Sequence, residues 1–192
     1  MKLQIGVMGS SGGILTGAEL ELARRLGARI ARRGGLIVTG ACPGLPHAAV
    51  LGAHEAGGES LGISPAHSRE EHVELYESPT EPYTAIAFAG SGLMGPEVDN
   101  IHSSDFVIFI AGRSGTLGEF CIAYDEGKLI GVLRNSGGLS NQFAQIAALF
   151  KKETGAVIIQ DYDPGDLIDR CVEMFEQARR SSAVAFENVP RG

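Results

Sequence analysis

The chain has 192 residues, of which 44% are hydrophobic, so it is long enough for one sizeable core and does not call for a second domain. The formal net charge is −7, from 16 Lys and Arg against 23 Asp and Glu, and this acidic balance argues against nucleic acid as a partner. Three widely spaced cysteines without a CxxC pair indicate neither a disulfide framework nor a zinc ribbon. No apolar run reaches the length of a signal-peptide core or a transmembrane helix, so we expect a cytoplasmic protein without membrane contact.

Short apolar runs alternate with amphipathic stretches almost to the end of the chain. In chain order we expect a strand over 3–8, a helix over 18–33, a strand over 36–39, a helix over 45–56, a strand over 60–64 and a polar surface excursion over 65–82. There follow strands over 83–89 and 105–111, a helix over 115–126, a strand over 129–133, a helix over 141–152, a strand over 156–160 and a helix over 166–180. Strands that are apolar on both faces and separated by helices indicate a parallel sheet covered on both sides. The sequence therefore predicts one Rossmann-like, doubly wound α/β domain over 1–180, with a flexible tail over 181–192.

Three glycine clusters, at 9–13, 40–44 and 112–116, each follow an expected strand and precede an expected helix. In an open parallel sheet this is the edge where ligands bind, and helix N-termini there present unpaired N–H groups to anions. Glycine lets the backbone approach a phosphate closely. The residues expected to bind the phosphate and the rest of its ligand are Gly9, Ser10, Ser11, Gly12, Gly40, Gly44, Gly112, Arg113, Ser114, Gly115 and Thr116.

The loops exclude two common nucleotide motifs. A Walker A loop needs Gly-Lys-Ser/Thr, and the glycine loops have no such Lys. The dinucleotide fingerprint needs G-x-G-x-x-G and an acidic residue after the second strand, and neither is present. His47 and His54 stand too far apart for an HExxH-type pair, so no metal site is expected.

Glu119 has two interpretations. Thr116-Leu-Gly-Glu119 fits the capping-box pattern, in which both side chains satisfy N–H groups at a helix start. Alternatively, Glu119 reaches the sugar of a bound nucleotide and acts as an acid or base while an N-glycosidic bond breaks. Cys42, in the second glycine loop, fits either a reactive thiol at a helix N-terminus or a small, partly buried filler.

With these loops placed, the sequence resembles the LOG-type family, often labelled lysine decarboxylase-like, and especially its subgroup with molybdenum cofactor carrier-like proteins. The resemblance runs from Ile5 to about Phe150 and is strongest in 6–10, 39–45 and 111–119. The last stretch is a version of the family signature P-G-G-x-G-T-x-x-E. The resemblance implies a homodimer or larger assembly. It also implies cleavage of nucleoside 5′-monophosphates to free base and ribose 5-phosphate, with the signature Glu assisted by an Arg from an upstream helix.

Two departures affect that implied activity. Arg113 replaces a signature glycine and adds a cation that could meet a phosphate. The upstream Arg is missing, because no Arg lies between Arg69 and Arg113 and Pro96 occupies its expected place. We therefore expect a protein that binds a phosphorylated small molecule, either a nucleoside 5′-monophosphate or a pterin-type cofactor, as a carrier or weak catalyst that requires no further cofactor. The alternative is a phosphoribohydrolase that uses Glu119.

Overall fold

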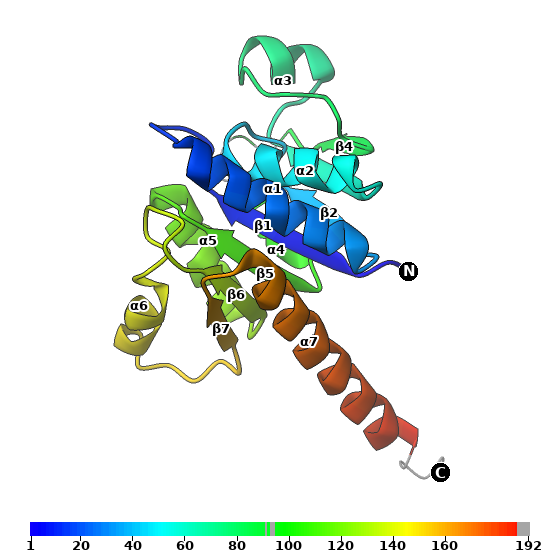
Figure 1. Ribbon diagram of the computed structural model, residues 1–192, viewed down its shortest axis with the longest axis vertical. Helices are drawn as coiled ribbons and strands as arrows, with labels where there is room; N and C mark the ends of the chain where they lie inside the picture. Colours follow the sequence, from blue (N-terminus) through cyan, green and yellow to red (C-terminus); the bar gives the residue numbers. More distant parts are fainter. Residues whose placement is uncertain (91, 93–94, 188–192) are drawn as a thin grey trace.

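The computed structural model describes residues 1–90, 92 and 95–187. Within them the strands are β1 (Gln4–Gly9), β2 (Leu36–Thr39), β3 (Glu59–Ser64), β4 (Ala85–Phe88), β5 (Phe106–Ile110), β6 (Leu129–Leu133) and β7 (Val157–Asp161). The helices there are α1 (Gly17–Arg32), α2 (Leu45–Glu55), α3 (Arg69–Glu74), α4 (Gly95–His102), α5 (Ser114–Asp125), α6 (Phe143–Leu149) and α7 (Pro164–Glu187). Figure 1 shows their arrangement.

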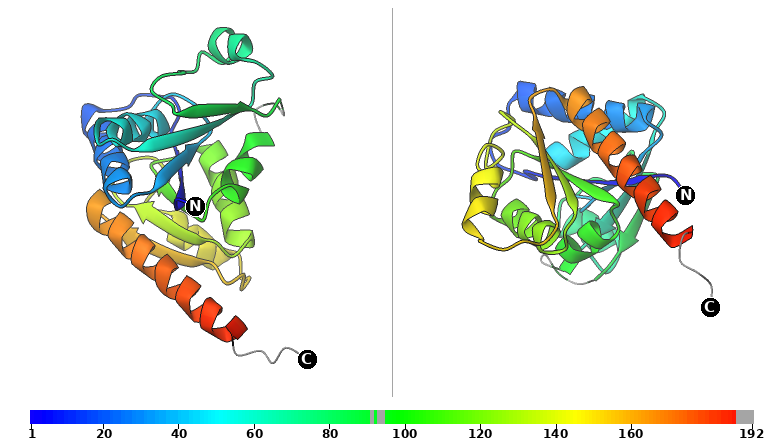
Figure 2. Two further views of the ribbon diagram at one scale, coloured as in Figure 1. Left: turned by 90° about the vertical axis from the view of Figure 1, so that its right-hand side faces the viewer. Right: turned by 90° about the horizontal axis from the view of Figure 1, so that it is seen from below.

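The strands form one parallel sheet in the order β4-β3-β2-β1-β5-β6-β7. The chain builds outward from β1 to β4 and then returns to place β5 on the other side of β1. Figure 2 shows the sheet between two helical layers, with α1 and α7 on one side and α5 on the other. This arrangement confirms the predicted Rossmann-like, doubly wound fold. The reversal between β1 and β5 is the topological switch point, where such sheets open a crevice at the strand ends.

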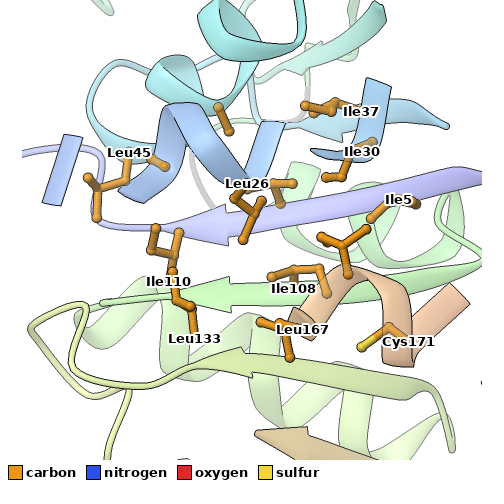
Figure 3. Packing of buried hydrophobic residues seen from close by; sticks show 14 of the residues in the cluster. Ile5, Leu26, Ile30, Ile37, Leu45, Ile108, Ile110, Leu133, Leu167 and Cys171 are labelled. Atoms are coloured by element: carbon orange, nitrogen blue, oxygen red, sulfur yellow. The ribbon is translucent and has the colours of Figure 1, made fainter. Parts of the chain in front are cut away.

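The core has one cluster on each face of the sheet. All residues of β5 are buried, and alternate side chains of the strand enter opposite clusters. Ile108 packs with Leu26 of α1 and Leu167 of α7, as Figure 3 shows. On the other face, Phe109 lies against a stack of Phe120 and Phe143, whose ring centroids are 4.6 Å apart. The central strands, which carry the glycine loops, are therefore held from both sides.

Helices α1 and α2 pack with their backbones in unusually close approach. A Cβ atom added to Gly27 of α1 would lie 1.8 Å from the carbonyl oxygen of Ala49. A Cβ atom added to Gly52 of α2 would lie 2.0 Å from the carbonyl oxygen of Arg24. The two glycines therefore set the spacing between the helices.

Several elements differ from the prediction. The excursion over 65–82 contains α3, which Ser68 caps by accepting a hydrogen bond from the Glu71 amide at 3.2 Å. Helix α4 follows β4 in a stretch where we expected no element, and α6 is shorter than the helix expected over 141–152. Helix α7 continues through 181–187, where a tail was expected, and the remainder of that expected tail, 188–192, lies outside the described residues. Within the described part of the chain, no helix has the length and hydropathy needed to cross a membrane.

Candidate functional site

A pocket of about 450 Å³ opens where the loops after β1, β2 and β5 meet. Its lining comprises Gly9, Ser10, Ser11, Gly40, Cys42, Pro43, Pro65, Tyr76, Ser78, Pro96, Glu97, Asn100, Arg113, Ser114, Gly115, Thr116 and Glu119. Nine of these were predicted as site residues, and they come from all three glycine loops and α5. The other three predicted residues, Gly12, Gly44 and Gly112, do not line the pocket.

Gly44 and Gly112 hold the loops together. The Gly112 amide donates a hydrogen bond of 3.1 Å to the Ser10 hydroxyl, which is buried. Gly44 has a φ of +80°, and a Cβ atom there would lie 2.4 Å from the Ser10 carbonyl oxygen. The Leu45 amide donates to that same oxygen at 2.9 Å. The first loop is thus fixed between the second and third, and the glycines allow this contact.

The first turn of α5 presents backbone N–H groups to the pocket. Arg113 is the N-cap residue, and no side chain in the described part of the chain caps the amides of this turn. Ser114, Gly115 and Thr116 of the turn all line the pocket. Because the positive end of a helix dipole accompanies these amides, the turn is suited to an anion.

Arg113 places a cation over the first glycine loop. Its guanidinium group lies so that a Cβ atom on Gly12 would be 3.5 Å from Nη2, so Gly12 is next to this cation although it does not line the pocket. Arg113 is exposed, and it forms no ion pair with any other described residue. This free charge and the α5 amides lie at the same end of the pocket, and together they would suit an anion.

The capping-box interpretation of Glu119 is wrong. Helix α5 begins at Ser114, so Thr116 already lies within its first turn and Glu119 lies one turn further on. The capping box of this chain is at α1 instead, where the Thr16 amide donates to the Glu19 carboxylate at 2.7 Å and the Glu19 amide donates to the Thr16 hydroxyl at 3.2 Å. The Glu119 carboxyl is free of a cap and borders the pocket.

Helix α4 brings a second carboxyl to Glu119. Glu97 lies against α5, and a Cβ atom on Gly118 would be 3.0 Å from its Oε2 atom, so Gly118 makes room for it. Burial, and secondarily the charge of Glu97, raise the pKa of Glu119 to about 8. Burial also raises the pKa of Glu97. At neutral pH the Glu119 carboxyl is therefore mostly protonated and can donate a hydrogen bond.

The site includes residues that the sequence analysis missed. Glu97 and Asn100 come from α4, while Tyr76 and Ser78 come from the excursion after β3. Glu97 and Asn100 are one helical turn apart, which would place them on the same face of a helix. The sequence analysis expected no helix there, so this spacing did not mark them as pocket residues.

Two further sequence-based interpretations concern the Cys42 thiol and a metal site. Burial, and secondarily the charge of Glu119, raise the pKa of the Cys42 thiol to about 12, which argues against a reactive thiolate. Among the described residues, no three His, Cys, Asp or Glu side chains converge in a way that could hold a metal ion.

The sequence was compared with known families and structures. A sequence model of the SLOG cluster4 family matches residues 2–168. The chain belongs to the SLOG cluster4 family. This membership confirms the predicted resemblance at the level of the LOG-like superfamily. A protein from Archaeoglobus fulgidus, described as uncharacterized, is similar in sequence. It is 32% identical over 135 residues, which are 70% of this chain and 82% of that protein.

Two solved structures resemble the SLOG cluster4 chain over nearly their whole length. The molybdenum cofactor binding protein from Rippkaea orientalis is 26% identical, with a TM-score of 0.73 over 93% of this chain and 98% of that one. The Moco carrier protein from Chlamydomonas reinhardtii is 22% identical, with a TM-score of 0.76 over 93% of this chain and 99% of that one. Because the identity to the Chlamydomonas reinhardtii protein is only 22%, that comparison shows a shared fold alone.

Proposed function

We propose that the chain binds a phosphorylated small molecule, either a nucleoside 5′-monophosphate or a pterin-type cofactor, and acts as a carrier. The observation that carries this proposal is the chemistry at one end of the pocket. There the uncapped first turn of α5 and the unpaired Arg113 face the same space, next to the first glycine loop. Phosphate is the group that such a combination of backbone amides, helix dipole and guanidinium recognises best.

The structural comparisons support a cofactor-like ligand. The Rippkaea orientalis protein, which matches over almost the whole chain, is described as binding the molybdenum cofactor. The pocket of about 450 Å³ lies within the usual range for a small-molecule site. The lining of the pocket combines apolar surface from Pro43, Pro65 and Tyr76 with polar groups, which suits a flat ring joined to a phosphate.

Glu119 favours a second candidate, a phosphoribohydrolase. With its pKa near 8, Glu119 could protonate a leaving base while the bond between the base and C1′ of ribose breaks and water adds to C1′. Against this candidate, α4 supplies Pro96, Glu97 and Asn100 to the pocket and no Arg. A carboxyl beside Glu119 does not replace a guanidinium in polarising the bond, so we rank the carrier function first.

One experiment tests both candidates. The purified protein is titrated calorimetrically with ribose 5-phosphate, a panel of nucleoside 5′-monophosphates and neopterin monophosphate, and the mixtures are then analysed by chromatography for free base. We expect binding without release of base. Arg113→Ala should weaken binding by about tenfold, because a charge-assisted contact to phosphate is lost. Arg179→Ala, which removes an exposed charge on α7, is the matched control and should bind as the wild type does.

The outcomes separate the candidates. If none of the phosphorylated compounds binds, or if Arg113→Ala binds each of them as tightly as the wild type, the proposed site is wrong. Release of free base from any nucleotide would favour the hydrolase. In that case Glu119→Gln should stop release while phosphate binding persists, because the amide cannot transfer a proton.

A further inference from the structure

The pocket extends across four neighbouring strand ends of the sheet. Arg113 and the first turn of α5 follow β5, whereas Pro65 directly follows β3, and Tyr76 and Ser78 belong to the same connection between β3 and β4. Strands β2 and β1 lie between β3 and β5. Neighbouring strands are about 4.8 Å apart, so β3 and β5 are separated by about 14 Å. If a phosphate binds at α5, the part of the ligand that lies farthest from the phosphate therefore faces the connection after β3.

A buried histidine fixes this connection to the sheet. His72 of α3 is fully buried, and its Nε2 atom donates a hydrogen bond of 3.1 Å to the carbonyl oxygen of Pro79. Its Nδ1 atom forms a hydrogen bond of 2.8 Å with the hydroxyl of Ser64, the last residue of β3. The Ser78 amide donates to the His72 carbonyl oxygen at 3.1 Å. The residues between α3 and Pro79, which include Tyr76, are therefore held in place near the end of β3.

Tyr76 lacks the contacts that hold the other tyrosines in this fold. It is half-buried and borders the pocket, but it belongs to neither core cluster and pairs with no other aromatic ring in the described part of the chain. Its hydroxyl forms no hydrogen bond with another described residue. Each of the other three tyrosines has a partner: the Thr39 hydroxyl for Tyr83, the Lys152 carbonyl oxygen for Tyr124 and the Arg134 guanidinium for Tyr162. The ring of Tyr76 is therefore available to a ligand.

We propose that Tyr76 binds the ring of the phosphorylated ligand by stacking on its face, with Pro43 and Pro65 adding apolar surface. This proposal rests on the proposed function, because the phosphate at α5 directs the rest of the ligand toward β3. Stacking on an aromatic side chain tolerates different rings, since every base has a π-face. Binding of the ring by Tyr76 therefore does not depend on which hydrogen-bond donors and acceptors the edge of the ring carries.

Titration calorimetry with ligands that have or lack a ring tests the proposal. AMP, GMP and neopterin monophosphate carry a ring, and ribose 5-phosphate has the phosphate without one. We expect at least one of the ring compounds to bind the wild type at least about tenfold more tightly than ribose 5-phosphate does. Tyr76→Ala should reduce that advantage to about threefold or less and leave the affinity for ribose 5-phosphate unchanged. Tyr76→Phe should keep the advantage, because the phenyl ring retains the stacking face.

Two further variants complete this comparison. Tyr76→Leu keeps a bulky apolar side chain without an aromatic ring, so it should behave as Tyr76→Ala and keeps the test available if that variant fails to fold. Leu75→Ala changes the preceding residue, which is exposed and does not line the pocket. This matched control should keep the full advantage of the ring compounds.

Fluorescence reports the contact directly. The chain contains no Trp, so Tyr76→Trp introduces a single indole at the proposed contact. The indole also has a large aromatic face, so this variant should still bind the ring compounds more tightly than ribose 5-phosphate. Its emission should change as AMP or GMP saturates the pocket and stay constant during a titration with ribose 5-phosphate, which places no ring beside residue 76.

The ligands distinguish failure of this proposal from failure of the proposed function. If ribose 5-phosphate binds and none of the ring compounds binds more tightly, the phosphate site stands and ring binding by Tyr76 is wrong. Ring binding is also wrong if the advantage persists in both Tyr76→Ala and Tyr76→Leu, or if these variants lose affinity for ribose 5-phosphate to the same extent as for the ring compounds. If ribose 5-phosphate and all the ring compounds fail to bind the wild type, the proposed function is wrong and this inference fails with it.

Discussion

Glu119 is held in a state that should make the stability of the protein depend on pH. Its pKa rises from an ordinary value of 4.5 to about 8 in the folded chain. Between these values the folded state binds a proton that the unfolded state releases, so the contribution of Glu119 is most favourable below pH 4.5 and is lost as the pH rises to about 8.

Glu119→Gln should therefore stabilise the protein at alkaline pH. We expect the variant to match the wild type near pH 4.5 and to exceed it at pH 8 by about 1 kcal/mol or more, since a pKa shift of one unit corresponds to about 1.4 kcal/mol. Urea unfolding across this pH range measures the difference. Glu173→Gln, which removes one exposed carboxyl of α7, controls for the change in net charge. If the stability of Glu119→Gln and of the wild type changed with pH in the same way, the pKa of Glu119 would not be raised in the folded protein.

The same residue shows the limits of local sequence motifs. The pattern Thr-x-x-Glu occurs at Thr16–Glu19 and again at Thr116–Glu119, and only the first forms a capping box. A capping box needs its Thr directly before the helix, and the Gly112 turn starts α5 too early for Thr116 to take that position. Glycine-loop residues could be predicted because strand, loop and helix follow one another in sequence. Glu97 and Asn100 reach the pocket only through tertiary packing.

At the scale of elements, buried strands were predictable and short helices were not. A continuous apolar run such as Phe106–Ile110 indicates a strand without further information. Helix α4 spans only eight residues and begins with Gly-Pro, so its sequence has no extended apolar period. Isolated helices of this length are unstable in water, and α4 depends on packing, with Ile101 fully buried among the residues of the second core cluster. The element that completes the site is thus the one whose formation depends most on the rest of the fold.

The close approach of α1 and α2 predicts a large effect from a small substitution. Gly27→Ala would place a methyl group 1.8 Å from a backbone oxygen, so the helices must separate and their shared core must loosen. We expect a loss of about 3 kcal/mol in the free energy of unfolding, measured with urea. Gly17→Ala, in the first turn of α1, meets nothing within 4 Å and is the matched control. Its effect should be neutral or slightly stabilising, and an equally small effect at Gly27 would mean that the helices are not in contact there.

At the scale of the whole molecule, the fold accounts for the position of the pocket. The reversal of strand order between β1 and β5 separates the helices that follow them and leaves space at their carboxyl ends. Alternation of strands and helices was enough to predict that the glycine loops meet at this edge of the sheet, where the pocket lies. It could not predict which other side chains border the pocket, because Tyr76 and Glu97 are supplied by connections whose path is set by long-range contacts.

The outer strand of the sheet leads to a prediction about assembly. Among the described strands, β4, labelled in Figure 1, stands at one end of the sheet and pairs only with β3. The strand is apolar, its Ala85 and Ala87 are exposed, and Phe88 is 38% exposed. An apolar edge strand left open in a monomer promotes association, so we expect the protein to form a homodimer or a larger homo-oligomer through this edge.

Light scattering after size-exclusion chromatography measures the assembly directly, as a multiple of the chain mass of 20.1 kDa. Phe88→Glu should shift the mass toward that of a single chain, because a charge at the edge opposes burial. Leu149→Glu changes another exposed apolar residue, on α6. This helix connects β6 and β7, which lie at the other end of the sheet from β4, so the mass should stay unchanged. A wild-type mass of one chain would refute assembly, and an unchanged oligomer in Phe88→Glu would place the interface on another surface. If Phe88→Glu yields monomers that still bind ribose 5-phosphate with wild-type affinity, the pocket is complete within one chain and assembly serves stability instead.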